Sequence, residues 1–264
     1  MIKYITQDKI DILILNNSEN GNVLNIDSLH SFIDALKKAE TNSDSRAVIL
    51  KSNGENFCLG MDLKFLEKVD DTKIAESSVM LYNELLTRIH TIHKPVISII
   101  NGKVKAGGMG IVGASDIAIA SETSTFEFSE IYFGLIPANV LPFIYNIRLT
   151  PQKLKYLILT AKQLNANEAL QIGLIDNVFS QAELNKGIKK IIKNLFRVSP
   201  AAAAETKKFI NELYNKDTAY MINLAREELL GLIKQPEVLD AVKSFNNGLL
   251  PKWFERFKTN MDFS

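Results

Sequence analysis

The residues best suited to chemistry are a glycine-rich turn and one acid, both within the stretch Asn101–Gly134. The turn Ala106-Gly107-Gly108 opens an apolar run, so its N–H groups would lie unpaired at a helix N-terminus, where they can hold an oxyanion. Glu130 lies among apolar and aromatic residues, where partial burial would raise its pKa and suit it to act as a general base. Together they suit removal of a proton beside a carbonyl. The residues alone leave open a packing turn and a surface or helix-capping glutamate.

The other reactive residue types predict no metal, cofactor or nucleophile. The three histidines lack metal-ligand spacing, no serine lies in a GxSxG turn, and the glycines match neither a phosphate loop nor a dinucleotide turn. Two acids in apolar runs are expected to brace turns, and the lone cysteine to be a small buried hydrophobe. These residues are His30, His90, His93, Asp62, Asp116 and Cys58.

Composition and charge exclude several classes of protein. The apolar share of 46% over 264 residues suffices for a large core, in one large domain or two small ones. A net charge of +1 argues against a general nucleic-acid or membrane-surface binder. No apolar run spans a bilayer, the N-terminus does not resemble a signal peptide, and one cysteine fits a reducing compartment. We therefore expect a cytoplasmic protein that binds neither nucleic acid nor membrane.

The elements that must position these residues alternate between strand and helix. Residues 2–15 predict a hairpin turning at Asp8-Lys9, and a helix is expected to start at Asp27-Ser28. Apolar runs at 47–51 and 96–100 predict buried strands, and two helical patterns fill 63–93, the second over 78–92. This rhythm favours helices covering a largely parallel sheet.

The second half of the chain becomes progressively helical. The glycine turn is followed by a helix over 109–114, predicted to be central because it is apolar nearly all round. The later expectations are strand 116–120, an extended piece over 125–128, helices 150–159 and 167–172, a strand-like run over 174–178, and helices 181–196, 200–215, 217–233 and 236–246. The helical tail has no long linker before it, so it is expected to be a lid or an oligomer surface, not an independent domain.

Three motifs resemble those of the crotonase (enoyl-CoA hydratase/isomerase) family. The segment 57–62 (FCLGMD) resembles its FxAGxD motif, 101–108 its NGxxxGGG motif, and 166–175 its A-x-EA-x-x-x-GL-V motif. The resemblance implies an α/β fold, a ββα spiral core over residues 1–195, with a C-terminal helical region over 196–264 used in trimer formation. It also implies an acyl thioester of coenzyme A or of an acyl carrier protein as ligand, and no cofactor.

By motif position, the resemblance assigns the site residues. The backbone N–H groups of Met61 and Gly107 form the oxyanion hole, and Glu130 is the second of the family's two acid/base glutamates. Gly60, Asp62 and Gly108 flank these groups and are assigned to substrate binding. Gly110 stands where hydratases carry their first glutamate. Water addition by two carboxylates is therefore disfavoured.

A narrower resemblance concerns the dehydratases of polyketide β-branching cassettes. Segments 102–120 and 128–143 are similar to those enzymes, which dehydrate a 3-hydroxy-3-methylglutaryl group on an acyl carrier protein to 3-methylglutaconyl. The resemblance implies that activity, with Tyr82 and Asn139 as candidates for binding the distal carboxylate. Cations expected to face an acidic carrier protein are Lys103, Lys105, Lys252, Arg256 and Lys258. A homotrimer or hexamer is expected. A Δ3,Δ2-enoyl-CoA isomerase and a non-catalytic binding subunit of the same fold remain alternatives.

Overall fold

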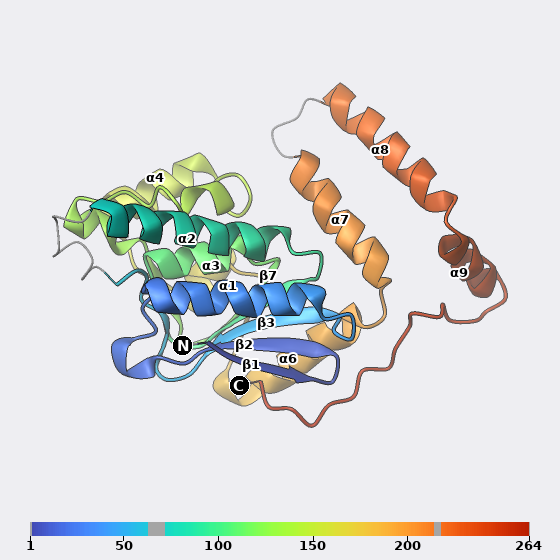
Figure 1. The fold of residues 1–264 in the computed structure, drawn as a ribbon, viewed down its shortest axis with the longest axis horizontal. Coiled ribbons are helices and arrows are strands. Elements are labelled where there is room, and N and C mark those ends of the chain that lie inside the picture. Colours follow the sequence, from blue (N-terminus) through green and yellow to red (C-terminus); the bar gives the residue numbers. More distant parts are fainter. Residues whose placement is uncertain (1, 63–71, 214–217, 264) are drawn as a thin grey trace. The chain divides into compact units, whose positions relative to one another are not determined.

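The computed structural model describes residues 2–62, 72–213 and 218–263. The chain forms two units (Figure 1). The core unit contains residues 1–189 and 259–264, and the helical unit contains residues 190–258. The first of the two helical patterns expected in 63–93 falls largely outside the described residues.

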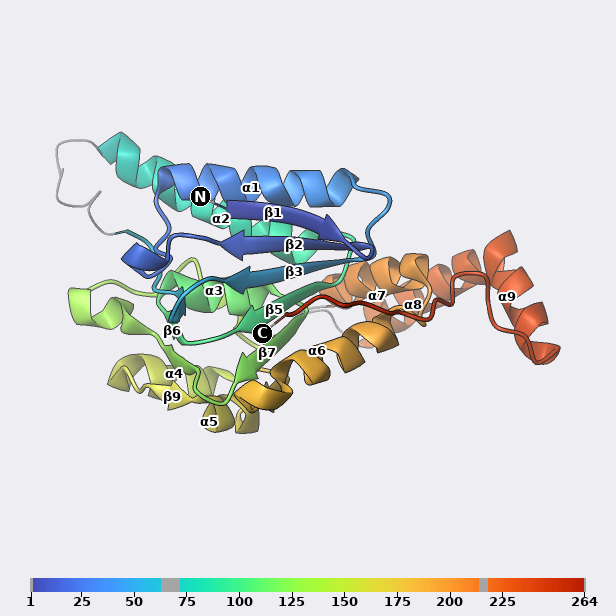
Figure 2. The ribbon, with the colours of Figure 1, turned by 90° about the horizontal axis from the view of Figure 1, so that it is seen from below.

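The larger sheet of the core unit has six strands in the order β1-β2-β3-β5-β7-β10. The hairpin β1–β2 is antiparallel, turning through Asp8 and Lys9, which both have positive φ, and the other strands pair in parallel. Figure 2 shows β1, β2, β3, β5 and β7 following one another, with α1 and α2 along one side. The predicted hairpin and largely parallel sheet are thus confirmed. The strands are β1 (Ile2–Gln7), β2 (Ile10–Leu15), β3 (Ala47–Ser52), β5 (Val96–Ile100), β7 (Ile117–Ser121) and β10 (Asn177–Phe179).

A second, smaller sheet carries the candidate site. Its order is β4-β6-β8-β9, in which β4, β6 and β8 are parallel and β9 is antiparallel. Each strand is two or three residues long, too short to show a hydrophobic period, so the sequence did not predict the sheet. The strands are β4 (Asn56–Cys58), β6 (Lys103–Lys105), β8 (Thr125–Glu127) and β9 (Leu164–Asn165).

Helix α3 (Gly107–Ala114) is the central helix of the core unit, as predicted, because every one of its residues is buried. Helix α1 (Ile26–Thr41) begins with a capping box between Asn25 and Ser28. Helix α2 (Thr72–Thr91) starts earlier than the expected residue 78. Among the described residues, the remaining helices before the helical unit are η1 (Ser18–Asn20), η3 (Ser129–Phe133), η4 (Leu141–Phe143), α4 (Pro151–Thr160) and α5 (Ala166–Gln171); α6 (Gln181–Leu195) runs on into that unit.

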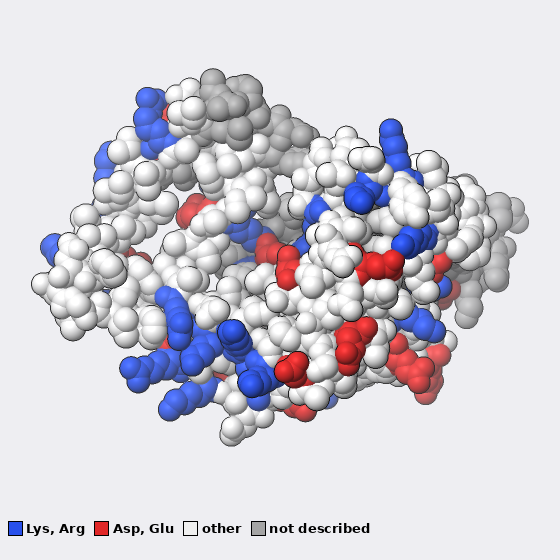
Figure 3. All heavy atoms as spheres, turned by 180° about the vertical axis from the view of Figure 1, so that it is seen from behind, with Lys and Arg blue, Asp and Glu red and all other residues white. Residues whose placement is uncertain are grey.

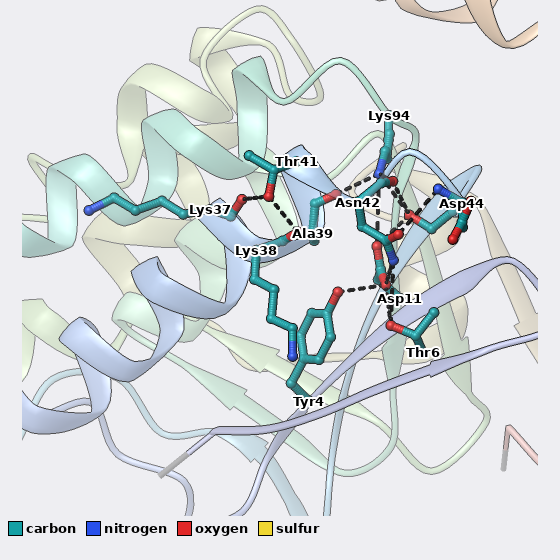
Figure 4. A network of polar contacts seen from close by, with 11 residues as sticks. Tyr4, Thr6, Asp11, Lys37, Lys38, Ala39, Thr41, Asn42, Asp44 and Lys94 are labelled. Atoms are coloured by element: carbon teal, nitrogen blue, oxygen red, sulfur yellow. Dashed lines mark hydrogen bonds and ion pairs between the residues drawn. The ribbon is translucent and has the colours of Figure 1, made fainter.

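A buried polar network joins the hairpin to the end of α1 and the start of β5 (Figure 4). Asp11 is fully buried and accepts hydrogen bonds from Tyr4 (2.7 Å), Thr6 (2.7 Å), Asn42 (2.8 Å) and Ser45. The Lys94 ammonium lies 3.9 Å from the Asp11 carboxylate. It also donates to the carbonyls of Ala39 and Asn42, so it caps the carboxyl end of α1 as well.

The helical unit contains α7 (Pro200–Leu213), α8 (Thr218–Ile233) and α9 (Pro236–Asn246), and no strand among its described residues, as predicted. The rings of Phe196 and Phe257 pack at 4.6 Å between centroids. Its helices expose many large apolar side chains, among them Ile222, at 64%, and Phe245, at 76%.

The last described residues return to the core unit, although the sequence suggested that they belong to the helical region. Phe263 is fully buried, its N–H donates to Asn185 (3.3 Å) and its carbonyl accepts from Lys51 (3.1 Å). The helical unit is therefore connected to the core unit at both of its ends.

Candidate active site

The site forms where the three parallel strands of the small sheet end. Gly60 follows β4, Gly107 follows β6 and Glu130 follows β8. Because the strands are parallel, their carboxyl ends meet at one edge of the sheet, which brings three distant segments together. This edge is the physical reason that the glycine turn and the glutamate share one site.

The turn of Met61 and the turn of Gly107 lie in direct contact. Gly60 has φ +94°, and a Cβ at this position would lie 2.9 Å from the Gly107 nitrogen and 2.9 Å from the Ala106 Cβ. Only a residue without a Cβ permits this approach. Gly60 therefore acts by letting the two turns meet.

The two predicted oxyanion donors are available to a ligand. The Leu24 N–H donates to Gly60 O (2.8 Å) and Leu24 O accepts from Asp62 N–H (2.9 Å), so Met61's own N–H points away from Leu24. Gly107 is the first residue of α3, so its N–H has no partner within the helix. Within the described residues neither N–H has an acceptor.

Ala106, just before α3, has a strained backbone, with φ +44° and ψ −119°. Its N–H donates to Glu127 O (3.0 Å) and its carbonyl accepts from Met109 N–H (2.8 Å). These bonds hold Ala106 in a conformation that few non-glycine residues adopt, and the conformation sets the direction of the next N–H, that of Gly107.

Glu130 presents one carboxylate oxygen without a partner. Its Oε2 is buried and accepts no hydrogen bond from any described residue. Burial raises the pKa of Glu130, and a hydrogen bond from its own backbone offsets this only in part. The prediction of a raised pKa is confirmed, and a carboxylate of this kind is a stronger base than an exposed glutamate.

A cavity of about 370 Å³ joins these parts. Its wall is mostly apolar, and its polar side chains are Tyr82, Ser129, Glu130 and Asn139. No Lys, Arg or His among the described residues lines it. The structure thus brings together five of the predicted site residues, namely Met61, Tyr82, Gly107, Glu130 and Asn139.

The other three predicted residues do not line this cavity. Gly60 packs against Ala106 and Gly107. Gly108 packs against the Cys58 backbone, since a Cβ at Gly108 would lie 2.4 Å from Cys58 O, so its glycine serves packing. Asp62 lines a separate hollow of about 200 Å³ beside Asn25. Direct substrate contact at these three positions has no support from this arrangement.

Tyr82, on α2, is a core residue that also reaches the cavity. It is 2% exposed, and its hydroxyl donates to Gly107 O. Burial raises the pKa of Tyr82 well above its usual value, and the nearby Cys58 and Glu130 raise it further. Tyr82 is therefore a neutral hydrogen-bond donor to the turn that carries Gly107, the predicted oxyanion donor.

Asn22 is a positioning residue that the sequence analysis missed. It is buried with φ +55°, and its amide donates to Asn53 O (2.9 Å) and Asn56 O (2.7 Å) while accepting from Asn17 N–H (2.8 Å). It thus ties the 17–24 loop to β4, which leads into Met61. An asparagine beside a glycine ahead of a helix was the available signal.

Cys58 is buried, as expected. Burial raises the pKa of Cys58 to about 12, as for a buried hydrophobe. Among the described residues no three His, Cys, Asp or Glu side chains cluster as metal ligands would. None of the described helices combines the length and the apolar character that crossing a membrane requires.

Comparison with known proteins gives a consistent result. Residues 6–256 match the family model described as enoyl-CoA hydratase/isomerase. The chain is 35% identical over 214 residues to the bacillaene synthase dehydratase PksH of Bacillus subtilis, covering 80% of this chain and 81% of that protein. It is 30% identical over 206 residues to a short-chain-enoyl-CoA hydratase of Clostridium acetobutylicum, covering 78% of each.

Solved structures share the fold. Human enoyl coenzyme A hydratase domain-containing protein 3 superposes with a TM-score of 0.90 at 22% identity, covering 96% of this chain and 99% of that one. At this identity the likeness concerns the fold alone.

Proposed function

Because the chain belongs to the enoyl-CoA hydratase/isomerase (crotonase) family, we propose that it is a dehydratase of an acyl-carrier-protein-bound 3-hydroxy-3-methylglutaryl thioester. The product would be the 3-methylglutaconyl thioester of polyketide β-branching. The observation that carries the proposal is the buried Oε2 of Glu130, which accepts no hydrogen bond from any described residue, in a cavity also lined by Met61 and Gly107. The similarity to a dehydratase of bacillaene synthase supports this choice within the family.

The proposed reaction needs only these groups. The thioester oxygen accepts hydrogen bonds from the N–H groups of Met61 and Gly107. The Glu130 carboxylate removes a proton from C2, and the C–H electron pair forms an enolate whose oxygen the two N–H groups stabilise. The enolate then collapses: the C2–C3 double bond forms, the C3–O bond breaks, and protonated Glu130 gives its proton to the departing hydroxyl. Water leaves and Glu130 returns to its carboxylate form.

The magnitudes are adequate for such a reaction. A single oxyanion donor contributes about 3–4 kcal/mol of transition-state stabilisation in other enzymes. A well-placed general base contributes about 10²–10⁴-fold in rate. A tertiary hydroxyl is also easier to eliminate than a secondary one, which makes a single base sufficient.

The distal carboxylate of the substrate needs a donor in or near the cavity. Tyr82 already donates its only hydroxyl hydrogen to Gly107 O. Asn139 lines the cavity and has no hydrogen-bond partner among the described residues. Of the two candidates, we therefore favour the Asn139 amide.

For the carrier protein we propose an electrostatic contact with exposed cations. Lys103, Arg256 and Lys258 are exposed, whereas Lys105 pairs with Glu127 at 2.7 Å and Lys252 with Asp240 at 3.1 Å. Figure 3 shows Lys and Arg side chains in blue on one face of the protein, without identifying single residues. A rise in KM for the carrier-bound substrate with increasing salt, absent for the coenzyme A thioester, would support this contact.

We also propose a homotrimer or hexamer. The exposed apolar side chains of the helical unit include Ile210, Ile222, Leu229, Leu239, Val242 and Phe245. Faces of this kind are usually covered in an assembly. Light scattering coupled to gel filtration measures the mass; a monomer at micromolar concentration contradicts the proposal.

The runner-up function is a Δ3,Δ2-enoyl-CoA isomerase, which also needs one base and an oxyanion hole. A Δ(3,5)-Δ(2,4)-dienoyl-CoA isomerase of Arabidopsis thaliana is 29% identical over 224 residues. The isomerase would return the proton to C4, whereas the dehydratase passes it to a hydroxyl.

One experiment separates these functions. Purified protein is offered the carrier-bound 3-hydroxy-3-methylglutaryl thioester and, separately, a 3-enoyl-CoA. Mass spectrometry reports loss of water, and the ultraviolet absorbance of the conjugated thioester reports double-bond migration. Dehydration without isomerisation supports the proposal, and isomerisation alone supports the runner-up. Turnover of neither points to a non-catalytic binding subunit.

A further inference from the structure

The space beside Gly110 is filled by the phenol of Tyr82. A Cβ at Gly110 would lie 2.1 Å from Tyr82 Oη and 3.2 Å from its Cζ. It would also lie 2.8 Å from Leu86 Cδ1, one helical turn along α2. Any side chain at position 110 therefore needs Tyr82 to move.

Tyr82 is held where it is from two sides. Its hydroxyl donates to Gly107 O, and its ring is buried in the core with Leu85 and Leu86 of the same helix. A Cβ at Gly107 would lie 3.3 Å from the same hydroxyl, so the phenol end also fits closely against the turn. Moving the ring would cost the hydrogen bond and leave a void in the core.

The phenol does not take over the chemistry of a carboxylate. The Tyr82 hydroxyl donates its hydrogen bond to the Gly107 carbonyl. The pKa of Tyr82 lies well above the usual value because the side chain is buried. Position 110 is where the family resemblance places the first of the two acid/base glutamates of hydratases. Tyr82 fills part of that space with a group that stays neutral.

We propose that Tyr82 is a specificity-determining residue, whose phenol closes the wall at Gly110 and so restricts the cavity to the chemistry of one carboxylate. The inference rests on the proposed function, in which Glu130 is the single base, and gives a steric reason for the absence of a second one. A second carboxylate, with the water it would order, has no room while Tyr82 is in place. The effect of a substitution at Gly110 should therefore depend on whether the Tyr82 phenol is present.

The first test is a double-mutant cycle in unfolding, which requires no substrate. Gly110→Ala should lower the midpoint of thermal unfolding by about 5 °C in the wild-type background, as overpacking does. In the Tyr82→Phe background the 2.1 Å contact is gone, so the same substitution should lower the midpoint by less than half as much. Equal losses in both backgrounds would overturn the proposal. The result stands whichever reaction the protein catalyses.

The second test asks whether the closed wall excludes hydration. Gly110→Glu, Tyr82→Ala and the double variant are assayed for water addition to crotonyl-CoA, by loss of enoyl-thioester absorbance, after circular dichroism confirms folding. Only the double variant should hydrate faster than wild type, by about 10-fold or more, since a well-placed general acid–base contributes at least 10²-fold. The proposal is contradicted if Gly110→Glu alone gains as much hydration activity as the double variant. It is also contradicted if a folded double variant hydrates crotonyl-CoA no faster than wild type. If the double variant does not fold, the unfolding cycle decides.

Discussion

The Cα of Gly60 lies against the backbone nitrogen of Gly107, so closely that a Cβ on Gly60 would be 2.9 Å from that nitrogen. The contact joins the turn after β4 to the turn after β6 and thereby sets the spacing of the two proposed oxyanion donors. The geometry of the proposed oxyanion hole depends on the absence of a Cβ at Gly60.

Gly60→Ala should therefore lower kcat by about 10²–10³-fold, comparable to losing one oxyanion donor, because the added Cβ pushes the two turns apart. Steady-state kinetics measure this. Gly173→Ala is the matched control: Gly173 also has positive φ, at +84°, but a Cβ there would have only Arg148 O at 3.5 Å. If both variants lose activity equally, backbone strain and not the spacing of the turns is responsible.

Glu130→Gln should lower kcat by about 10²–10⁴-fold with the fold intact, since the amide cannot accept the proton. The matched control is Glu122→Gln, at an exposed position, which should keep full activity. Near-wild-type turnover by the Glu130 variant would refute the single-base mechanism.

The raised pKa of Glu130 makes a pH prediction. The base must be ionised, so kcat/KM should fall at acid pH with a midpoint above the usual glutamate value of about 4.3. A pH–rate profile measures this midpoint, and a midpoint at or below the usual value contradicts it.

The same shift affects stability with a definite sign. The folded pKa lies above the unfolded one, so the folded state binds the proton more tightly. The favourable contribution is complete below the unfolded pKa and is lost as pH rises through the folded pKa. Glu130→Gln should therefore be more stable than wild type at pH 8, with a smaller difference at pH 4, as measured by urea unfolding.

Asn22→Ala should lower kcat about 10-fold or more with little change in KM. The substitution removes the hydrogen bonds to Asn53 O and Asn56 O that position the strand leading to Met61, but it leaves the residues that line the cavity unchanged. Asn20→Ala is the control, since Asn20 is exposed and its side-chain amide donates to Asn17 Oδ1 at 3.1 Å. A change in KM alone would indicate that Asn22 affects substrate binding instead.

Asp11→Ala should destabilise the protein by about 3–5 kcal/mol, because the buried Lys94 ammonium loses its counter-charge. Asp34→Ala removes the exposed partner of Lys37 at 3.9 Å and should cost less than about 1 kcal/mol. Urea unfolding of both variants gives the comparison. Equal losses would show that the network in Figure 4 contributes no more than a surface pair.

The sequence predicted features that depend on local pattern or on chemical type. The hairpin at Asp8-Lys9, the buried central helix after the glycine turn and the raised pKa of Glu130 are all confirmed. Each follows from residues close together in the chain.

Features that depend on packing between distant segments were not predicted. The small sheet has strands too short to show a period, yet it brings the site together. The family resemblance implied a missing glutamate at Gly110, but the sequence could not show that Tyr82 fills the space. Asn22 acts through carbonyls more than thirty residues away, which no local motif reveals.

The return of Thr259–Phe263 to the core unit has a consequence for synthesis on the ribosome. Phe263 is part of the interior of the core unit, but it is translated after all of the helical unit. Domains usually fold in the order in which they are made. Here the interior of the core unit is completed by Phe263 only after the helical unit has been synthesised.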